Sequence, residues 1–507
     1  MKILSWAIKY KWIIIFFILA LSSILFLKAC RKRKESFKQK KKVETFMNKK
    51  IKKVILDNGL TILVFKNTQT PKVLLQIAYD VGSWVEQEGE RGMAHLIEHM
   101  IFKGTEKLSE GDIDSIARKY GASFNAFTGK DMTSYYFEVD KNNWQPFVGI
   151  LADCMENARF DSQHLASEFR AVIQELKMMS DNSWRFMLSE AARIIFPSNY
   201  PYHFPIIGFK QDLVSMTADR LKKFYKKYYR PKRATLFMVG DIDIDEAIQI
   251  ATKNFKDIPD GVPEDKIIRD KDSMFKLIPD TVTHETKIYE DVKREQLGFY
   301  WLIPGLRSGS EEIVSVLQFI LGNSEGSRLY KRLVEEEKVA ASVGCMGHQL
   351  MEAGIFFILV EPLQGNIERC RELVAQELNK LIKEGLKDYE LDKVVKTKER
   401  EFFQKLQSLS SFTYEWIKSF IATRDELDIF SKVKRLEKID SNKIKKFTKH
   451  FLDPFFMNQI EVLPLPEDKK EVWLELKKES DELDKLILET HPRTAPLEKP
   501  KFIKTLP

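Results

Sequence analysis

The spacing of apolar positions changes along the chain, and each spacing predicts a type of element. Between residues 164 and 180 the apolar positions recur at steps of three and four, which predicts an amphipathic helix with one buried face. Short apolar runs bounded by turn residues predict strands at 72–81, 122–127, 134–139 and 234–239. Strands and helices alternate in blocks, so the pattern favours an α+β fold with helices packed on one face of an antiparallel sheet.

The second half of the chain repeats this order of elements. A strand at 298–302 leads into a helix at 310–321, as the strand at 72–81 leads into a helix around residue 95. Residues 257–283 are rich in Asp, Lys and Pro and show no sustained apolar period, which is typical of a linker. The predicted units are an N-terminal domain over 54–260, a linker over 261–283, a C-terminal domain over 284–479 and a charged tail over 480–507.

Residues 1–53 differ from the rest of the chain. Trp12 to Leu27 is a run of 16 residues without a charge, flanked on both sides by lysines and arginines. This pattern favours an uncleaved membrane anchor, followed by a basic tether against anionic lipid headgroups. A cleaved signal peptide and lipidation at Cys30 are the alternatives. By the positive-inside rule, the basic flank after the run would stay in the cytoplasm.

The net charge of +8 has its origin in this leader. Residues 1–53 hold 16 Lys and Arg against 2 Glu, so residues 54–507 carry a formal charge of −6. The basic balance therefore does not indicate a nucleic-acid partner, and we expect none. The four cysteines show no metal-type spacing.

The strongest chemical signal is the sequence His95-Leu96-Ile97-Glu98-His99 within a segment of good helix formers. Residues four apart on a helix are about 40° apart around its axis, so both imidazoles project from one face. Glu98 lies about 60° to the other side of His95 and shares that face. Two imidazoles suit zinc, and a neighbouring carboxylate can act as general base. The motif predicts a zinc site with Glu98 as the base for hydrolysis.

A catalytic zinc site needs a third protein ligand and an open fourth position. The predicted helix 164–180 carries Glu168 and Glu175, seven positions apart and within about 20° of each other around the axis. One of them could bind the metal while the other orients a ligand from behind. The spacing alone leaves open which of the two binds.

These segments resemble the pitrilysin-like metallopeptidases, zinc enzymes with an inverted His-x-x-Glu-His motif. The resemblance extends through Phe102-Lys103-Gly104-Thr105, Asn125-Ala126-Phe127-Thr128 and the stretch Asp131 to Tyr136. In that family the third ligand is a glutamate 76 positions after the second histidine, where Glu175 stands in a Val-Ile-x-Glu context. A second family glutamate, seven residues earlier, matches Glu168. The resemblance implies one zinc ion per chain, held by His95, His99 and Glu175, with Glu168 supporting the ligands.

The resemblance also implies an architecture and a substrate. Two homologous halves would enclose a chamber, and an extended peptide would pair with the strand 122–127 at Asn125, Ala126 and Phe127. The second half has no His-x-x-Glu-His, and Val314 lies roughly where His95 would fall, so we expect this half to be non-catalytic. The resemblance implies that the domains after the leader lie in the periplasm. This conflicts with the positive-inside rule, so the side of the membrane on which they lie stays open.

One departure from the family pattern suggests a partner. Family members often carry an Arg and a Tyr seven residues apart after a Ser-Arg-Leu segment, where they hold substrate, but this chain has Val334 and Ala341 there. We therefore expect a paralogous subunit that carries the Arg/Tyr pair, unless this lineage binds substrate without it. The predicted function is a membrane-anchored zinc metalloendopeptidase of extended or unfolded peptides. The alternative is a non-catalytic scaffold or peptide-binding paralogue of the same fold.

Overall fold

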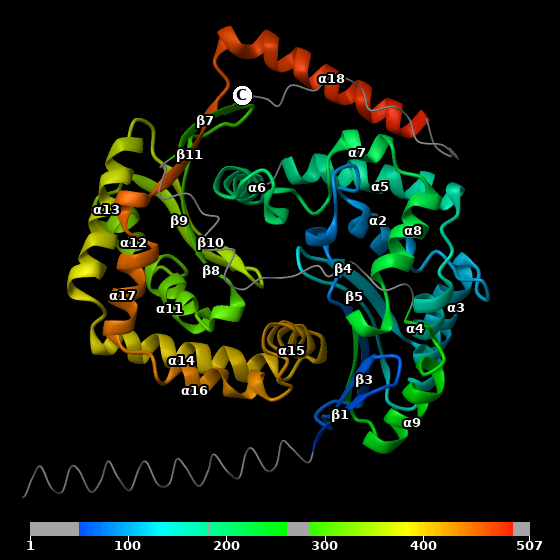
Figure 1. The fold of residues 1–507 in the computed structure, drawn as a ribbon. Helices are drawn as coiled ribbons and strands as arrows, with labels where there is room; N and C mark the ends of the chain where they lie inside the picture. Colours follow the sequence, from blue (N-terminus) through cyan, green and yellow to red (C-terminus); the bar gives the residue numbers. More distant parts are fainter. Residues whose placement is uncertain (1–49, 181–182, 261–283, 490–507) are drawn as a thin grey trace, which may run out of the picture.

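Two β-sheets, one from each half of the chain, organise the fold (Figure 1). The computed structural model describes residues 50–180, 183–260 and 284–489. The first sheet has six strands in the order β1-β2-β6-β3-β5-β4. These strands are β1 (Ile51–Ile55), β2 (Thr61–Lys66), β3 (Lys72–Tyr79), β4 (Ser123–Thr128), β5 (Thr133–Asp140) and β6 (Ala234–Gly240).

The second sheet repeats the strand order of the first. Its order is β7-β11-β8-β10-β9, which matches β2-β6-β3-β5-β4 strand for strand. In each sheet the first pair of that series runs parallel (β2 with β6, β7 with β11), and the other neighbours run antiparallel. The strands are β7 (Glu285–Glu290), β8 (Gln296–Pro304), β9 (Ala340–Gln349), β10 (Ala353–Pro362) and β11 (Asn458–Pro464). The predicted α+β class with two similar halves is confirmed.

Helices surround the two sheets, and most of them pack within their own half of the chain. In the first half they are α2 (Met93–Met100), α3 (Glu110–Tyr120), α4 (Gln145–Asn157), α5 (Ser162–Ser180), α6 (Ser183–Ile195), α7 (Lys210–Val214), α8 (Ala218–Tyr228) and α9 (Ile244–Phe255). In the second half they are α11 (Glu311–Leu321), α12 (Arg328–Tyr330), α13 (Ile367–Glu384), α14 (Asp388–Lys405), α15 (Leu409–Thr423), α16 (Lys432–Leu436), α17 (Ser441–Phe451) and α18 (Lys470–Glu489).

The two halves each place one helix on the other half's sheet. Helix α15 contacts β3 and β6 of the first sheet, and α6 contacts β8 and β10 of the second. Strand β3 shows the consequence, because its alternate side chains enter different cores. Leu75 joins the core under the first half's own helices, whereas Leu74 joins the cluster around Trp416 of α15. Both faces of the sheet are buried, so the sequence of β3 is a nearly continuous run of apolar residues.

Two predicted boundaries are wrong. Residues 51–53 were expected in the tether, but they begin β1 and pair with residues 63–65 of β2. Residues 480–489 were expected in the charged tail, but they complete α18, which packs on α5 and α7 and buries Leu483 and Ile487. Helix α18 thus crosses back from the second half to the first (Figure 1).

The predicted membrane anchor, Trp12 to Leu27, lies outside the described residues. In the part of the chain that the structure describes, none of the helices combines the length and apolar character needed to cross a bilayer.

Candidate metal centre

Helix α2 is held at its start by a buried carboxylate. Glu86 accepts hydrogen bonds from the backbone N–H groups of Gly92 (3.0 Å) and Ala94 (2.9 Å), which have no partner inside the helix. Burial raises the pKa of Glu86 to about 8, although these two hydrogen bonds oppose the rise. Gly92 has φ +95°, and a Cβ atom there would lie 2.6 Å from the carbonyl oxygen of Ile207. Only glycine fits this entry into the helix without strain.

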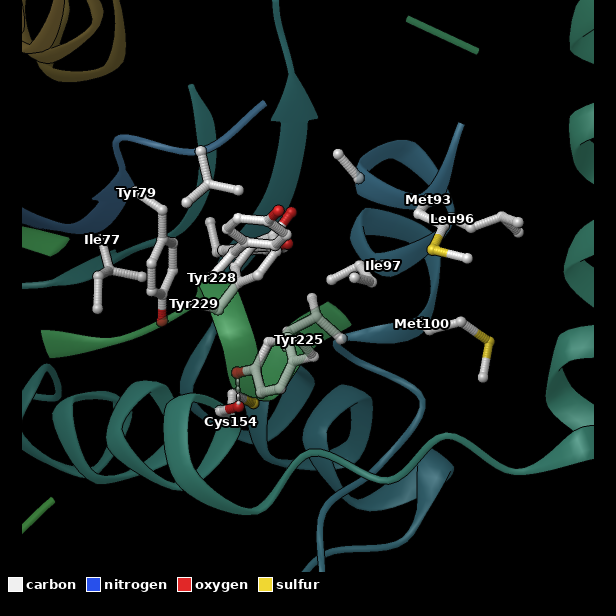
Figure 2. Close-up of a cluster of buried hydrophobic side chains, with 14 of the residues drawn as sticks. Ile77, Tyr79, Met93, Leu96, Ile97, Met100, Cys154, Tyr225, Tyr228 and Tyr229 are labelled. Carbon is white, nitrogen blue, oxygen red and sulfur yellow. Dashed lines mark hydrogen bonds between the residues drawn. The ribbon is translucent and has the colours of Figure 1, made fainter. Parts of the chain in front are cut away.

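The inner face of α2 fixes the rotation of the helix about its axis (Figure 2). Four apolar side chains are buried on this face: Met93, Leu96, Ile97 and Met100. They belong to the same core as the tyrosines of α8, of which Tyr225 donates a hydrogen bond to the carbonyl of Cys154 at 2.5 Å. With that face anchored, the remaining positions His95, Glu98 and His99 are only partly buried.

Helix α5 brings Glu175 opposite the two histidines. His95 Nε2 lies 3.3 Å from Glu175 Oε2, and His99 Nε2 lies 3.5 Å from Glu175 Oε1. Ligand bonds of roughly 2.0–2.2 Å in a tetrahedral zinc site place neighbouring donor atoms about 3.4 Å apart. Donor atoms of all three residues lie within 4.8 Å of one another. The donor types and their spacing therefore fit a zinc ion.

Glu168 supports His99 from behind. Its Oε2 accepts a hydrogen bond from His99 Nδ1 at 3.0 Å, and its Oε1 forms an ion pair with Lys103 Nζ at 2.8 Å. Because Nδ1 donates, the lone pair of His99 is on Nε2, the nitrogen that faces Glu175. Burial opposes ionisation of Glu168, but the contacts with His99 and Lys103 lower its pKa to about 2.

The same contacts act on the histidine. Burial of His99 disfavours its charged form, yet the hydrogen bond to Glu168 and the negative charge of Glu175 raise its pKa. His95 lacks such a supporting carboxylate, since its Nδ1 is buried with no hydrogen bond in the described part of the chain. For Glu175, the contact with His95 lowers the pKa.

A cavity of about 490 Å³ opens beside this centre, between the two halves. Its wall includes His95, Glu98 and Glu175 from the first half, and His348, Leu350 and Ile355 from the second. Within the described residues, the Glu98 carboxylate has no hydrogen bond or ion pair. It is therefore available to a water molecule or substrate in the cavity.

Strand β4 forms the free edge of the first sheet next to the cavity. Among the described strands it pairs only with β5, and Phe127 and Thr128 at its end line the cavity. The side chain of Asn125 is exposed, and its oxygen accepts the N–H of Ala126 at 2.8 Å. Asn125, Ala126 and Phe127 thus lie along an open strand edge that leads to the metal centre.

The structure does not bring Val334 and Ala341 to the cavity. Val334 packs against the core of the second half, and Ala341 is exposed on β9. Arg332, the nearest arginine in sequence, pairs with Glu336 at 3.2 Å and Glu337 at 2.8 Å.

Sequence reasoning missed four residues around this centre. Lys103 belongs to the segment Phe102-Lys103-Gly104-Thr105 just after α2, so only its nearness in sequence to His99 could have pointed to it. Glu86, Lys130 and His348 carry no local signal, because only long-range contacts bring them to α2 or to the cavity.

Two models of one protein family match the chain. The model described as "Insulinase (Peptidase family M16)" matches residues 61–203, which include the metal centre. The model described as "Peptidase M16 inactive domain" matches residues 215–398, which include most of the second sheet.

Individual relatives agree with these matches. The chain is 27% identical over 368 residues to "Zinc protease PqqE" of Helicobacter pylori, covering 70% of this chain and 80% of the relative. It is 22% identical over 336 residues to a probable mitochondrial-processing peptidase subunit beta of Arabidopsis thaliana, covering 64% of this chain and 62% of the relative.

Solved structures show the same fold. A protease from Helicobacter pylori matches with a TM-score of 0.75 and 23% identity, covering 82% of this chain and 99% of that one. The periplasmic protease PqqL of Escherichia coli matches with a TM-score of 0.67 and 19% identity, covering 90% of this chain and 52% of that one.

Proposed function

This chain belongs to peptidase family M16, and on that basis we propose that it is a zinc-dependent metalloendopeptidase that hydrolyses extended or unfolded peptides. The observation that carries the proposal is the convergence of His95, His99 and Glu175 beside a cavity that Glu98 also lines. A scaffold or peptide-binding protein would need neither three spaced ligands nor an unpaired carboxylate next to them.

His95 Nε2, His99 Nε2 and a Glu175 carboxylate oxygen would hold one zinc ion per chain. When bound, zinc lowers the pKa of a coordinated water to about 7 and polarises a substrate carbonyl. Glu168 and Lys103 keep the His99 ring in one orientation and leave its Nε2 unprotonated. The Glu86 cap and the buried face of α2 keep both histidines at their positions as substrate enters and leaves.

Glu98 would act as general base and then as general acid. Its carboxylate takes a proton from the attacking water and returns it to the nitrogen of the leaving amine. A carboxylate without a hydrogen bond or ion pair in the described residues suits both steps, since no protein group must be displaced first.

The peptide would lie extended along the free edge of β4. Main-chain hydrogen bonds to an exposed strand edge require an unfolded segment and are insensitive to side chains. The N–H of Ala126 donates to the side-chain oxygen of Asn125, and a bound peptide would replace that oxygen as the acceptor. Phe127 would lead the peptide into the cavity that contains the metal ligands.

Three further points belong to the proposal. The similarity to the periplasmic protease PqqL supports an extracytoplasmic body, and the run Trp12 to Leu27 supports an N-terminal membrane anchor. The positions of Val334 and Ala341, away from the cavity, support a paralogous subunit that supplies an Arg/Tyr pair to hold substrate.

Replacement of the base tests the proposal. The Glu98→Gln variant should retain zinc, measured by elemental analysis, while kcat/KM on a quenched fluorescent peptide falls by roughly 10²–10⁴-fold. The matched control is Glu90→Gln, a carboxylate outside the cavity lining. If Glu98→Gln cleaves within a few-fold of wild type, another group is the base. If zinc-loaded wild type cleaves no unfolded peptide, the non-catalytic alternative holds.

A further inference from the structure

Lys130 places an unpaired ammonium group in the wall of the cavity. It lies on the turn between β4 and β5, whose backbone is held by hydrogen bonds from Ser83 N to Gly129 O (3.3 Å) and from Trp84 N to Lys130 O (3.0 Å). The Lys130 side chain lines the cavity together with His95 and Glu98. It has no hydrogen bond or ion pair with any residue that the structure describes.

The nearest carboxylates do not account for this lysine. Burial lowers the pKa of Lys130 to about 8, and the charges of Glu86 and Asp131 oppose this fall, but neither carboxylate lies within ion-pair distance of the lysine. Glu86 is engaged by two backbone N–H groups of α2. Asp131 accepts the hydroxyl of Tyr202 at 2.5 Å and the N–H of Met351 at 2.9 Å. Both acidic groups thus have donors of their own, while the ammonium group has no acceptor among the described residues.

His348 faces the same cavity from the other half. It lies on β9, where its backbone pairs with Ile355 of β10. Burial and the positive charges of Lys130 and Lys418 lower the pKa of His348 to about 4. At neutral pH its imidazole is uncharged and can donate one hydrogen bond into the cavity. Of the three residues of the second half that line this cavity, His348 alone carries a polar side chain.

We propose that Lys130 and His348 form a subsite that binds a carboxylate of the substrate peptide, either an Asp or Glu side chain or the C-terminus. An ammonium group and a neutral donor match the charge and the lone pairs of such a group, and charge-assisted bonds in a partly enclosed site are strong. Lys130 and His348 come from different halves of the chain, so they would hold such a carboxylate between the two halves. Lys130 lies two residues beyond the end of β4, within reach of a peptide that continues past that strand.

The subsite rests on the proposed function. Its test measures the ratio of kcat/KM between a peptide that carries the carboxylate and the matched peptide that lacks it. Quenched peptides carry Glu or Gln at each position near the cleaved bond, and each is made with a free and with an amidated C-terminus. We expect kcat/KM to favour Glu at one position, or the free C-terminus, by about tenfold or more. In Lys130→Gln the ratio should fall to near one, and in Lys130→Glu a Lys-containing peptide should become preferred.

Control variants separate binding from folding. Lys141→Gln removes a lysine that pairs with Asp241 at 2.7 Å, and it should keep the wild-type ratio. His348→Gln retains a donor and should keep more of the ratio than His348→Leu. If Lys130→Gln is inactive, the affinities of the Glu and Gln peptides are compared in zinc-loaded Glu98→Gln with and without the Lys130 change.

Two results would overturn the subsite. One is a wild-type enzyme that cleaves peptides but discriminates neither Glu from Gln nor a free from an amidated C-terminus. The other is a ratio, in cleavage or in binding, that survives in Lys130→Gln. A wild-type protein that binds Glu peptides preferentially but cleaves nothing would reject the proposed function and leave the subsite in place.

Discussion

Removing Glu168 should weaken zinc binding without removing a ligand. The carboxylate fixes the His99 ring through a 3.0 Å hydrogen bond and is itself held by Lys103 at 2.8 Å. In Glu168→Ala the ring must be ordered when zinc binds, which costs about 0.5–1.5 kcal/mol for one side chain. The variant also removes the negative charge of Glu168, which increases the basicity of the His99 imidazole. Together we expect a loss of roughly 10–100-fold in affinity, or about 1.4–2.7 kcal/mol.

The isosteric variant separates these two effects. Glu168→Gln keeps one oxygen that can accept from His99 Nδ1, but it loses the charge and the ion pair with Lys103. Its zinc affinity should therefore fall less than that of Glu168→Ala, by about tenfold. Glu138→Gln is the control, because Glu138 forms a 2.8 Å ion pair with Lys72 elsewhere on the first sheet.

Affinity is measured by competition with a chromophoric zinc chelator, at pH 8. This pH reduces competition from protons at His99, whose pKa is raised by its contact with Glu168. Circular dichroism of the metal-free proteins checks that the fold is intact. Equal zinc affinity of wild type and Glu168→Ala would refute the supporting role, as would a loss of the same size in Glu138→Gln.

Other predictions concern the third ligand, the domain boundary and the partner. Glu175→Gln should lose stoichiometric zinc in elemental analysis, and full zinc content in that variant would reject Glu175 as a ligand. A protein that starts at Lys50 should be soluble without detergent and bind zinc. One that starts at Val54 lacks the buried Ile51 of β1 and should melt at a lower temperature. Equal melting temperatures of the two proteins would show that residues 51–53 are dispensable for stability. Co-purification from the native source should yield a paralogous subunit that raises kcat/KM, and a monomer or homodimer that gains nothing from any co-purified chain would reject the two-subunit enzyme.

Local chemistry is the part of this protein that its sequence determines. The His-x-x-Glu-His spacing places three side chains on one helical face, whatever the rest of the chain does. The period of the segment around Glu168 and Glu175 predicts a helix, and α5 is that helix. The hairpin of β1 and β2 likewise follows from a turn sequence between two apolar runs. Each of these depends on residues within a few positions of one another.

The choice between Glu168 and Glu175 needed more than local spacing. Both lie on nearly the same side of α5, and only the packing of α5 on α2 puts Glu175 near both Nε2 atoms and Glu168 near Nδ1 of His99. The resemblance to a family had suggested the same assignment, but no periodicity could, because a rotation of about 20° around the helix does not distinguish two long side chains.

The cavity is entirely a product of tertiary structure. Helices α6 and α15 each lie on the sheet of the opposite half, which no apolar pattern reveals, since a buried face looks the same whichever half covers it. This exchange brings His348 of β9 to the cavity lined by Lys130 of the β4–β5 turn, 218 positions earlier in the chain. Glu86 reaches the start of α2 in the same way, through a loop whose path only the folded chain specifies. The sequence determined which groups can bind and activate zinc, and the packing of the two halves decided what surrounds them.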